Sequence, residues 1–331
     1  MGISSQKRST AEWLRAVLVG VMAFAVGSWA TGATAQEKLT ILSGYDIQFM
    51  HGYIADKEGM FKEEGLDVTV KYSVSGKVAV DGVVAGAGVL GISGSLVSVT
   101  AATQAPIYVV APLARSEHLM EMVTLPGIDE AADLKGKRIA FQFGTEGHKF
   151  VLLYLQKNGL SVDDVTLMNI PAQALPPALS RGDVDVVAVW PPHSTKALEA
   201  TTGAKVLTTS HGVSAVYGVV IMRKDFVESN PEGGRKLLRG LLRADKFIKE
   251  NPERTLEYFA EQGKIDMATA RKINAGAKPE YGMALDKAFF DENQASADFL
   301  ADHGFTPSRA DANDFMHEQL MRDVAPELVT F

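Results

Sequence analysis

Apolar and polar positions in the first part of the chain predict strands that alternate with helices. Short apolar or alternating runs predict strands at 39–43, 66–72, 89–93 and 107–111, and the intervening stretches predict helices at 48–64, 78–84 and 95–103. A strand–helix order of this kind indicates parallel strands with helices on both faces of the sheet.

A second block repeats this construction and ends in a long helical region. Apolar runs predict strands at 138–143, 165–170, 184–190, 205–209 and 216–222, with helices at 148–158 and 172–181. Beyond residue 224 the pattern is helical: Asn230-Pro231 and Asn251-Pro252 each combine an N-cap residue with proline at the first helical position. Two final helices are expected at 287–302 and 308–323. The pattern therefore predicts an α/β protein with two units around a cleft and a helical C-terminal tail.

The first 35 residues have the organisation of a secretory signal peptide. Lys7, Arg8 and Arg15 precede an apolar run at 16–30, and the small residues Ala33 and Ala35 occupy the positions that signal peptidase reads. A transmembrane anchor is the alternative, but 15 helical residues cover only about 22 Å of a hydrocarbon core of roughly 30 Å. We expect cleavage near Ala35/Gln36 and export of a soluble product to the periplasm.

Composition removes several classes of protein. The 331 residues include no cysteine, which excludes disulfides, thiolate metal sites and cysteine nucleophiles. The net charge of −7 becomes −9 without residues 1–35, which carry three basic residues and one acidic one, and this acidity argues against a nucleic-acid partner. A hydrophobic content of 46% predicts a well-packed protein rather than a disordered chain.

Five motifs occur in order behind the predicted signal peptide. They are YIADKEGMFKEEGLDV at 53–68, GISGS at 91–95, LKGKRIA at 134–140, RGDVD at 181–185 and WPP at 190–192. Together they resemble the sulfonate/taurine/nitrate group of substrate-binding proteins that serve ABC importers. The resemblance covers nearly all of the expected mature chain, although the tail is similar only in its helical character and carries none of the motifs.

The resemblance implies a two-lobe periplasmic binding protein fold of type II, with the ligand cleft between the lobes. Lobe one would comprise 37–114 and 220–331, and lobe two 115–219. Two crossover strands would lie near 109–116 and 216–222, which the apolar pattern had already marked as strands. The implied partners are a small organic anion and a membrane ABC permease. We expect a monomer without cofactor or metal.

Two strand-to-helix turns are the main candidates for the ligand site. Ligands of open α/β sheets bind beyond the carboxyl ends of the strands, where helix N-termini favour anions. Ser93, Gly94 and Ser95 form one such turn, and Thr145 and His148 belong to the other. These two turns would hold a sulfonate or carboxylate from both sides. Glu146 would repel an anion there, so we expect it to cap its own helix and point away.

Further candidates lie at strand ends or in the crossovers. They are the aromatic residues Tyr45, Phe143, Trp190 and Tyr217, the polar residues Asp46 and Gln48, and Arg115, whose guanidinium could bind an anion in bidentate fashion. Core packing is the alternative for the aromatic residues, and plain solvation for Arg115.

One departure from the family pattern bears on the ligand. The resemblance implies an acidic residue between the tryptophan and the proline of taurine-type relatives, but Pro191 and Pro192 follow Trp190 directly. The ligand therefore either lacks an amine or has its cation met elsewhere, for instance by Asp46 or Glu117.

The predicted function is solute capture by cleft closure and delivery to a permease, with a sulfonate-like anion as the solute. An aromatic carboxylate, nitrate, a pyrimidine-like heterocycle and a chemoreceptor-partner role remain alternatives. An enzyme is disfavoured because the sequence has no G-x-S-x-G, H-E-x-x-H, Walker or G-x-G-x-x-G motif. His51, His118, His193 and His211 have no metal-like spacing and receive no role.

Overall fold

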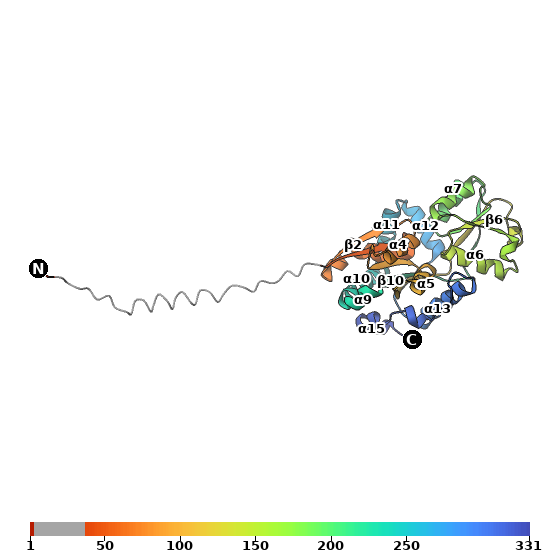
Figure 1. Cartoon of the computed structure of the whole chain (residues 1–331). Coiled ribbons are helices and arrows are strands. Elements are labelled where there is room, and N and C mark those ends of the chain that lie inside the picture. Colours follow the sequence, from red (N-terminus) through yellow and green to blue (C-terminus); the bar gives the residue numbers. More distant parts are fainter. Residues whose placement is uncertain (3–36) are drawn as a thin grey trace. The chain divides into compact units, whose positions relative to one another are not determined.

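The computed structural model describes residues 1–2 and 37–331 (Figure 1). The predicted signal peptide, apart from Met1 and Gly2, lies outside the described residues. In the described part of the chain, no helix is both long enough and apolar enough to cross a membrane.

A six-stranded mixed sheet forms the larger half of residues 37–331. Its strands run in the order β11-β4-β10-β3-β1-β2. Their bounds are β1 Glu37–Ser43, β2 Leu66–Tyr72, β3 Leu90–Gly94, β4 Ile107–Ser116, β10 Val216–Arg223 and β11 Glu280–Tyr281. β1 pairs in parallel with β2 and β3, whereas β10 is antiparallel to both β3 and β4. The strands predicted to be parallel in the first part of the chain, β1 to β4, do run in one direction, since β10 is antiparallel to both β3 and β4. β10 itself returns from the other sheet without a crossover helix and runs against them.

A five-stranded sheet of order β7-β6-β8-β5-β9 forms the smaller half. Its strands are β5 Glu121–Thr124, β6 Arg138–Phe141, β7 Thr166–Asn169, β8 Val186–Val189 and β9 Lys205–Thr209. β6 is parallel to β7 and β8, while β5 is antiparallel to β8 and β9. We call residues 37–116 and 216–331 the large half and residues 117–215 the small half. The chain crosses between the halves at 117–120 and 210–215.

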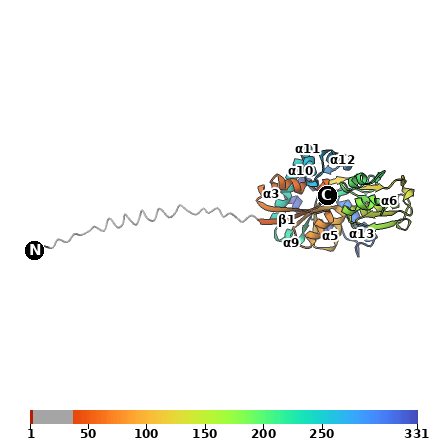
Figure 2. The same cartoon turned by 90° about the horizontal axis from the view of Figure 1, so that it is seen from above.

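Helices surround both sheets. In the large half they are η1 Ile47–Phe49, α2 Met50–Lys57, α3 Met60–Glu63, α4 Gly76–Val84, α5 Ser95–Gln104, α9 Lys224–Ser229, α10 Pro231–Glu250, α11 Pro252–Gly263, α12 Met267–Ala277, α13 Lys287–Asp302, α14 Ala312–Phe315, α15 Gln319–Val324 and η5 Pro326–Leu328. In the small half they are η2 Ala131–Leu134, α6 Glu146–Lys157, η3 Val162–Asp164, η4 Ala172–Ala174, α7 Leu175–Ser180 and α8 His193–Ala200. Seen from above, α6 lies at the end of the molecule opposite α3 and β1 (Figure 2).

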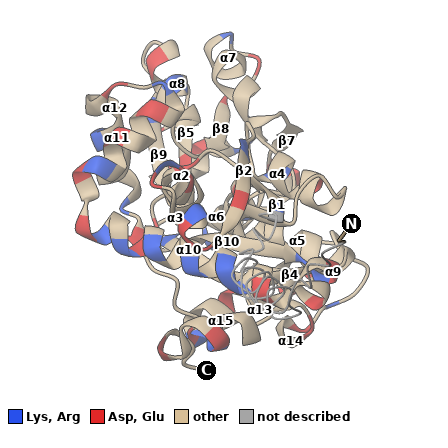
Figure 3. Cartoon of the chain, turned by 90° about the vertical axis from the view of Figure 1, so that its left-hand side faces the viewer, with Lys and Arg blue, Asp and Glu red and all other residues tan. Residues whose placement is uncertain are grey.

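The helical tail covers the large half. α10 packs against α2 and α3, and α13 packs against α5. The buried face of α10 carries Leu237, Leu238 and Leu241, as the helical spacing predicts. Basic residues follow the outer face of α10 (Figure 3), where Arg239 pairs with Glu64. The tail therefore belongs to the half that begins and ends the described chain, which periodicity alone could not establish.

Two predicted helices are broken in the structure. The helix expected at 48–64 is divided into η1, α2 and α3. Gly59, which adopts a left-handed conformation with φ of 73°, separates α2 from α3. The helix expected at 308–323 is reduced to the short helices α14 and α15. By contrast, β2, β9 and α13 have the bounds that the pattern predicts.

Candidate functional site

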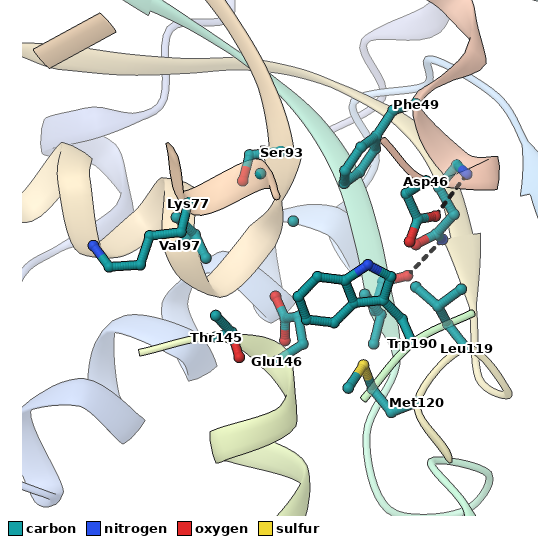
Figure 4. A pocket seen from close by; sticks show the side chains of 14 residues that line it. Asp46, Phe49, Lys77, Ser93, Val97, Leu119, Met120, Thr145, Glu146 and Trp190 are labelled. Atoms are coloured by element: carbon teal, nitrogen blue, oxygen red, sulfur yellow. Dashed lines mark hydrogen bonds between the residues drawn. The ribbon is translucent and has the colours of Figure 1, made fainter. Parts of the chain in front are cut away.

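A narrow pocket lies where residues of the two halves meet (Figure 4). The large half contributes Asp46, Gln48, Phe49, Gly76, Lys77, Ser93, Gly94, Val97 and Val216, and the small half contributes Leu119, Met120, Thr145, Glu146 and Trp190. Six of the predicted site residues are in this lining: Asp46, Gln48, Ser93, Gly94, Thr145 and Trp190. The two predicted turns therefore face one pocket.

Three helices begin at this pocket. α4 starts at Gly76 after the N-cap Ser75, α5 starts after Gly94, and α6 starts after Thr145. Each follows the carboxyl end of a parallel strand, which is where α/β sheets bind ligands. The first N–H groups of a helix have no intrahelical acceptor, and the helix dipole adds partial positive charge. Three such helix starts give the pocket a capacity for anions that does not depend on basic side chains.

The first turn of α4 approaches the end of β3 very closely. A Cβ atom built on Gly76 would lie 2.5 Å from the Ser93 Oγ, so only glycine allows this approach. Ser93 is fully buried, and its hydroxyl has no protein partner among the described residues. A buried hydroxyl beside the start of a helix is available to a bound solute.

Glu146 reaches across the boundary between the halves. Its Oε1 accepts a hydrogen bond from the Leu96 N–H at 2.5 Å and another from the Ser95 hydroxyl at 3.0 Å. The expectation that Glu146 caps its own helix is therefore wrong: it caps α5, whose N-cap residue Gly94 has no side chain to do so. Ser95 is thus engaged by Glu146 and does not line the pocket.

Burial raises the pKa of both acidic residues in the pocket. Glu146 is 6% exposed and Asp46 2% exposed. Burial raises the pKa of the Glu146 carboxyl group, although the nearby Lys149 ammonium opposes this shift. Burial likewise raises the pKa of Asp46 to about 7, although its Oδ1 accepts a hydrogen bond from the Gln48 N–H at 2.8 Å.

Gln48 is held by one end of its side chain. Its Nε2 donates to the Val216 carbonyl at 3.0 Å, and its Oε1 is buried without a partner among the described residues. This arrangement fixes the amide so that the oxygen remains free to accept. Gln48 therefore offers the pocket an acceptor.

Lys77 is the one basic residue among the lining residues that the structure describes. Its Nζ donates to both carboxylate oxygens of Asp81, one turn further along α4, at 3.1 Å. In Figure 4 the Lys77 ammonium group points away from Trp190. The side chain therefore supplies no direct charge to the pocket interior.

The remaining walls of the pocket are apolar. The Trp190 indole lies beside the Glu146 carboxylate, with Phe49, Leu119 and Met120 nearby (Figure 4). Trp190 is also the only tryptophan between residues 36 and 331. An aromatic wall with few polar groups suits a small organic solute better than a fully hydrated ion.

Besides Ser95, five of the predicted site residues lie outside the pocket lining. Tyr45 stacks on Phe259 with its ring centroid 5.1 Å away, and Tyr217 packs against Phe289 at 5.3 Å. Arg115 forms ion pairs with Glu117 and, at 3.5 Å, with Glu280. The structure therefore directs these three side chains to protein partners.

The other two residues outside the lining, Phe143 and His148, form an aromatic cluster. The His148 ring lies 4.7 Å from the rings of both Phe143 and Phe305. Burial lowers the pKa of His148 to about 4, and its Nδ1 accepts a hydrogen bond from the Gly144 N–H at 3.3 Å. His148 therefore packs as a neutral ring and makes a contact between the halves.

Sequence reasoning missed eight lining residues: Phe49, Gly76, Lys77, Val97, Leu119, Met120, Glu146 and Val216. Gly76 and Lys77 carry a usable signal, since they open the helix that follows β2, just as Ser95 opens the helix that follows β3. Leu119 and Met120 lie in the first crossing between the halves and look like ordinary core residues in the sequence. Among the described residues, no group of three or more His, Asp or Glu side chains could hold a metal ion.

Comparisons with known proteins agree with this arrangement. The taurine-binding periplasmic protein of Escherichia coli is 28% identical over 299 residues, which cover 84% of this chain and 91% of that protein. The alkanesulfonate-binding protein SsuA from Xanthomonas axonopodis pv. citri, solved with bound MOPS, has a TM-score of 0.76 at 21% identity and covers 86% of this chain and 100% of its own. The periplasmic nitrate-binding protein NrtA from Synechocystis PCC 6803 has a TM-score of 0.74 at 14% identity, with 89% of each chain covered.

The two solved structures share the fold of this chain, which is that of periplasmic binding proteins. The sequence profile described as NMT1/THI5 like matches residues 46–255, more than half of the chain. The match begins at Asp46 and includes the starts of α4, α5 and α6 as well as Trp190. The chain therefore belongs to the NMT1/THI5-like family.

Proposed function

We propose that this protein is the periplasmic solute-binding component of an ABC import system. Its solute is a small organic compound with an anionic, sulfonate-like group. The protein captures the solute in the pocket between its halves and delivers it to a membrane permease without altering it chemically. The names of the E. coli and Xanthomonas relatives, which bind taurine and alkanesulfonates, support this assignment.

The observation that carries the proposal is the meeting of three helix starts at one pocket. The N-termini of α4 and α5 come from the large half, and that of α6 comes from the small half. An anion placed among them receives backbone N–H groups and dipole stabilisation from both sides. We propose that the anionic end of the solute lies beside Ser93 and the first residues of α4, because Glu146 already occupies the start of α5.

Capture requires the halves to separate, because both of them line the pocket. We propose that the large half and the small half act as two lobes that rotate about the crossings at 117–120 and 210–215. These lobes differ by only a few residues from the bounds expected from the sequence, 37–114 with 220–331 and 115–219. Contacts across the boundary would hold the closed state: Glu146 with Leu96, and Lys149 with Glu292 at 2.5 Å. A ligand that bridges the lobes adds its own contacts to these and shifts the population toward closure.

Binding can be tested on residues 36–331 with purified protein. Sulfonates, carboxylates, nitrate and pyrimidine-like heterocycles would be compared by thermal shift and by the fluorescence of Trp190. A ligand at 100 times its dissociation constant stabilises the native state by about 2.7 kcal/mol, which gives a clear rise in melting temperature. We expect a sulfonate to produce the largest shift. The absence of any shift across the panel would contradict a solute-binding role.

Four further observations would test the remaining parts of the proposal. The periplasmic protein should begin at Gln36 by mass spectrometry, and it should be monomeric by light scattering. Ligand recovered from the protein should be chemically unchanged, since turnover would indicate an enzyme. Loss of uptake on deletion of the gene, with chemotaxis toward the solute intact, would distinguish transport from a sensing role.

A further inference from the structure

Asp46 brings a buried carboxyl group to the pocket without a cationic partner among the residues that the structure describes (Figure 4). The residue is 2% exposed, and its Oδ1 accepts a hydrogen bond from the Gln48 N–H that caps the start of η1. A buried carboxylate with one N–H donor and no counter-charge is costly, whereas the neutral acid is not. The surroundings of Asp46 therefore favour its protonated form.

The two tyrosine hydroxyl groups near Asp46 are directed to other acceptors. Tyr281 donates to the Ile47 carbonyl at 2.7 Å, and Tyr45 donates to the Phe259 carbonyl at 3.2 Å. Burial, and after it the charge of Asp46, raises the pKa of both phenols, so that both stay neutral. Neither hydroxyl group therefore stabilises an ionised Asp46.

The other charged groups of the pocket do not help Asp46 either. Glu146 accepts two hydrogen bonds at the start of α5, and the Lys149 ammonium group opposes the effect of burial on its pKa. Glu146 thus has support for a negative charge that Asp46 lacks. Lys77, the basic residue of the lining, donates to Asp81.

An anion in this pocket would add to the cost of ionising Asp46. Its proposed position is beside Ser93 and the start of α4, in the same lining as Asp46. The two places adjoin, because a Cβ atom built on Gly44 would lie 2.6 Å from the Gly76 N atom. Two like charges repel strongly in a pocket with little water, and the repulsion ends when the weaker acid takes up a proton. A sulfonic acid is far stronger than aspartic acid, so the proton binds to Asp46.

We infer that Asp46 binds the anionic group of the solute as a neutral carboxylic acid, and that capture of the solute takes up one proton from water. Asp46 Oδ1 keeps its bond from the Gln48 N–H, while an O–H group on Oδ2 donates to the anion. One anion and one proton enter together, so the net charge of the pocket does not change. This inference rests on the proposed solute-binding function and makes Asp46 a hydrogen-bond donor to an anion, not a partner for a cation.

Calorimetric titration of residues 36–331 with propane-1-sulfonate between pH 5 and 9 tests the inference. This probe stays ionised throughout and has no proton to give, and buffers of different ionisation enthalpy reveal how many protons are taken up. The pKa of Asp46, about 7, predicts almost no uptake at pH 5 and close to one proton at pH 9. The affinity should fall by up to about tenfold per pH unit above pH 7.

Variants assign the proton to Asp46. Asp46→Asn cannot ionise but keeps a donor and an acceptor, so it should take up no proton and bind the probe almost equally at pH 5 and 9. At pH 9 it should bind at least about tenfold more tightly than the wild type, a gain that the loss of a merely structural contact could not produce. Glu146→Gln should retain the proton uptake. Asp163→Asn, an exposed position in η3 outside the pocket, is the matched control and should behave as the wild type.

The outcomes separate this inference from the proposed function. Constant affinity without proton uptake from pH 5 to 9 would overturn the inference while solute binding stands, and this wild-type result does not depend on the folding of any variant. Failure of the probe to bind at pH 5, when other solutes bind, would overturn it too, since a neutral Asp46 does not repel an anion. Proton uptake that persists in Asp46→Asn would overturn the assignment to this residue. Binding of no solute in the wider panel would contradict the proposed function itself.

Discussion

Glu146 at the start of α6 accepts a 2.5 Å hydrogen bond from the Leu96 N–H in the first turn of α5. The bond joins the small half to the large half beside the pocket. It also places a carboxylate where an anionic ligand of α5 would otherwise bind. The same side chain thus fastens the two halves and limits which solutes the pocket can accept.

Removing this carboxylate should weaken the native state. In Glu146→Ala the Leu96 N–H and the Ser95 hydroxyl both lose their acceptor, and we expect a loss of about 1–3 kcal/mol in the free energy of unfolding. Glu146→Gln keeps an oxygen in place and should lose less than about 1 kcal/mol. Urea denaturation measures both values. Equal stability of the alanine variant and the wild type would show that the bond does not hold the halves together.

The pH dependence of stability should contain a component from Asp46. Its pKa is about 7 in the folded protein against 3.8 for an ordinary aspartate, so the folded state retains a proton that the unfolded chain has released. The contribution of Asp46 is therefore fully present below about pH 4 and is lost as the pH rises toward 7. The slope is at most about 1.4 kcal/mol per pH unit.

Other groups make the comparison with a variant necessary. Glu146 contributes with the same sign as Asp46, because its pKa is also raised. His148 contributes with the opposite sign, because its lowered pKa, about 4, makes stability fall as the pH drops below 6.5. Asp46→Asn should remove only the component from Asp46, so the variant should gain stability relative to wild type as the pH rises from 4 to 7. Parallel pH profiles of the two proteins would contradict the assignment.

Lys149 and Glu292 form a buried ion pair between the halves. Their N···O distance is 2.5 Å, and the side chains are only 5% and 17% exposed. Glu292→Gln leaves the Lys149 ammonium buried with the Ser296 hydroxyl as a neutral partner, and we expect a loss of about 3 kcal/mol, typical of breaking a buried pair.

The exposed pair Lys287–Asp291, one turn apart on α13, is the matched control. Lys287→Ala should cost no more than about 0.5 kcal/mol, because water screens both charges. Denaturation curves of Glu292→Gln and Lys287→Ala measure the loss in the free energy of unfolding for each pair. Similar losses for both would mean that burial at the boundary between the halves adds nothing to the pair.

Much of the fold could be predicted where a local pattern determines the structure. The alternation in 66–72 predicts β2 because one face of this strand meets solvent, and the Asp286 N-cap with its apolar positions predicts α13. The antiparallel pairing of β10 was not predictable in this way. It depends on the path of the chain between the two sheets, and no local pattern records that path.

The candidate site likewise contains some residues that the sequence could predict and others that it could not. Ser93, Gly94 and Thr145 could be predicted because a turn from strand to helix is visible in the sequence and its position in α/β sheets is general. The direction of a side chain was not predictable: Tyr45 turns to Phe259, and Glu146 turns to the opposite half. These choices depend on which surface lies opposite, and only tertiary packing determines that.

Arg115 is the residue for which the prediction from the sequence and the position in the structure differ most. The sequence predicts an anion ligand, whereas the structure pairs its guanidinium with Glu117 and Glu280 outside the pocket lining. Arg115→Ala should therefore change the affinity for a sulfonate probe by less than about twofold. Ser93→Ala should reduce that affinity by roughly 2- to 10-fold, because one neutral hydrogen bond contributes about 0.5–1.5 kcal/mol. Titrations followed by Trp190 fluorescence compare the two variants, and a larger loss in Arg115→Ala would mean that the guanidinium turns into the site when ligand binds.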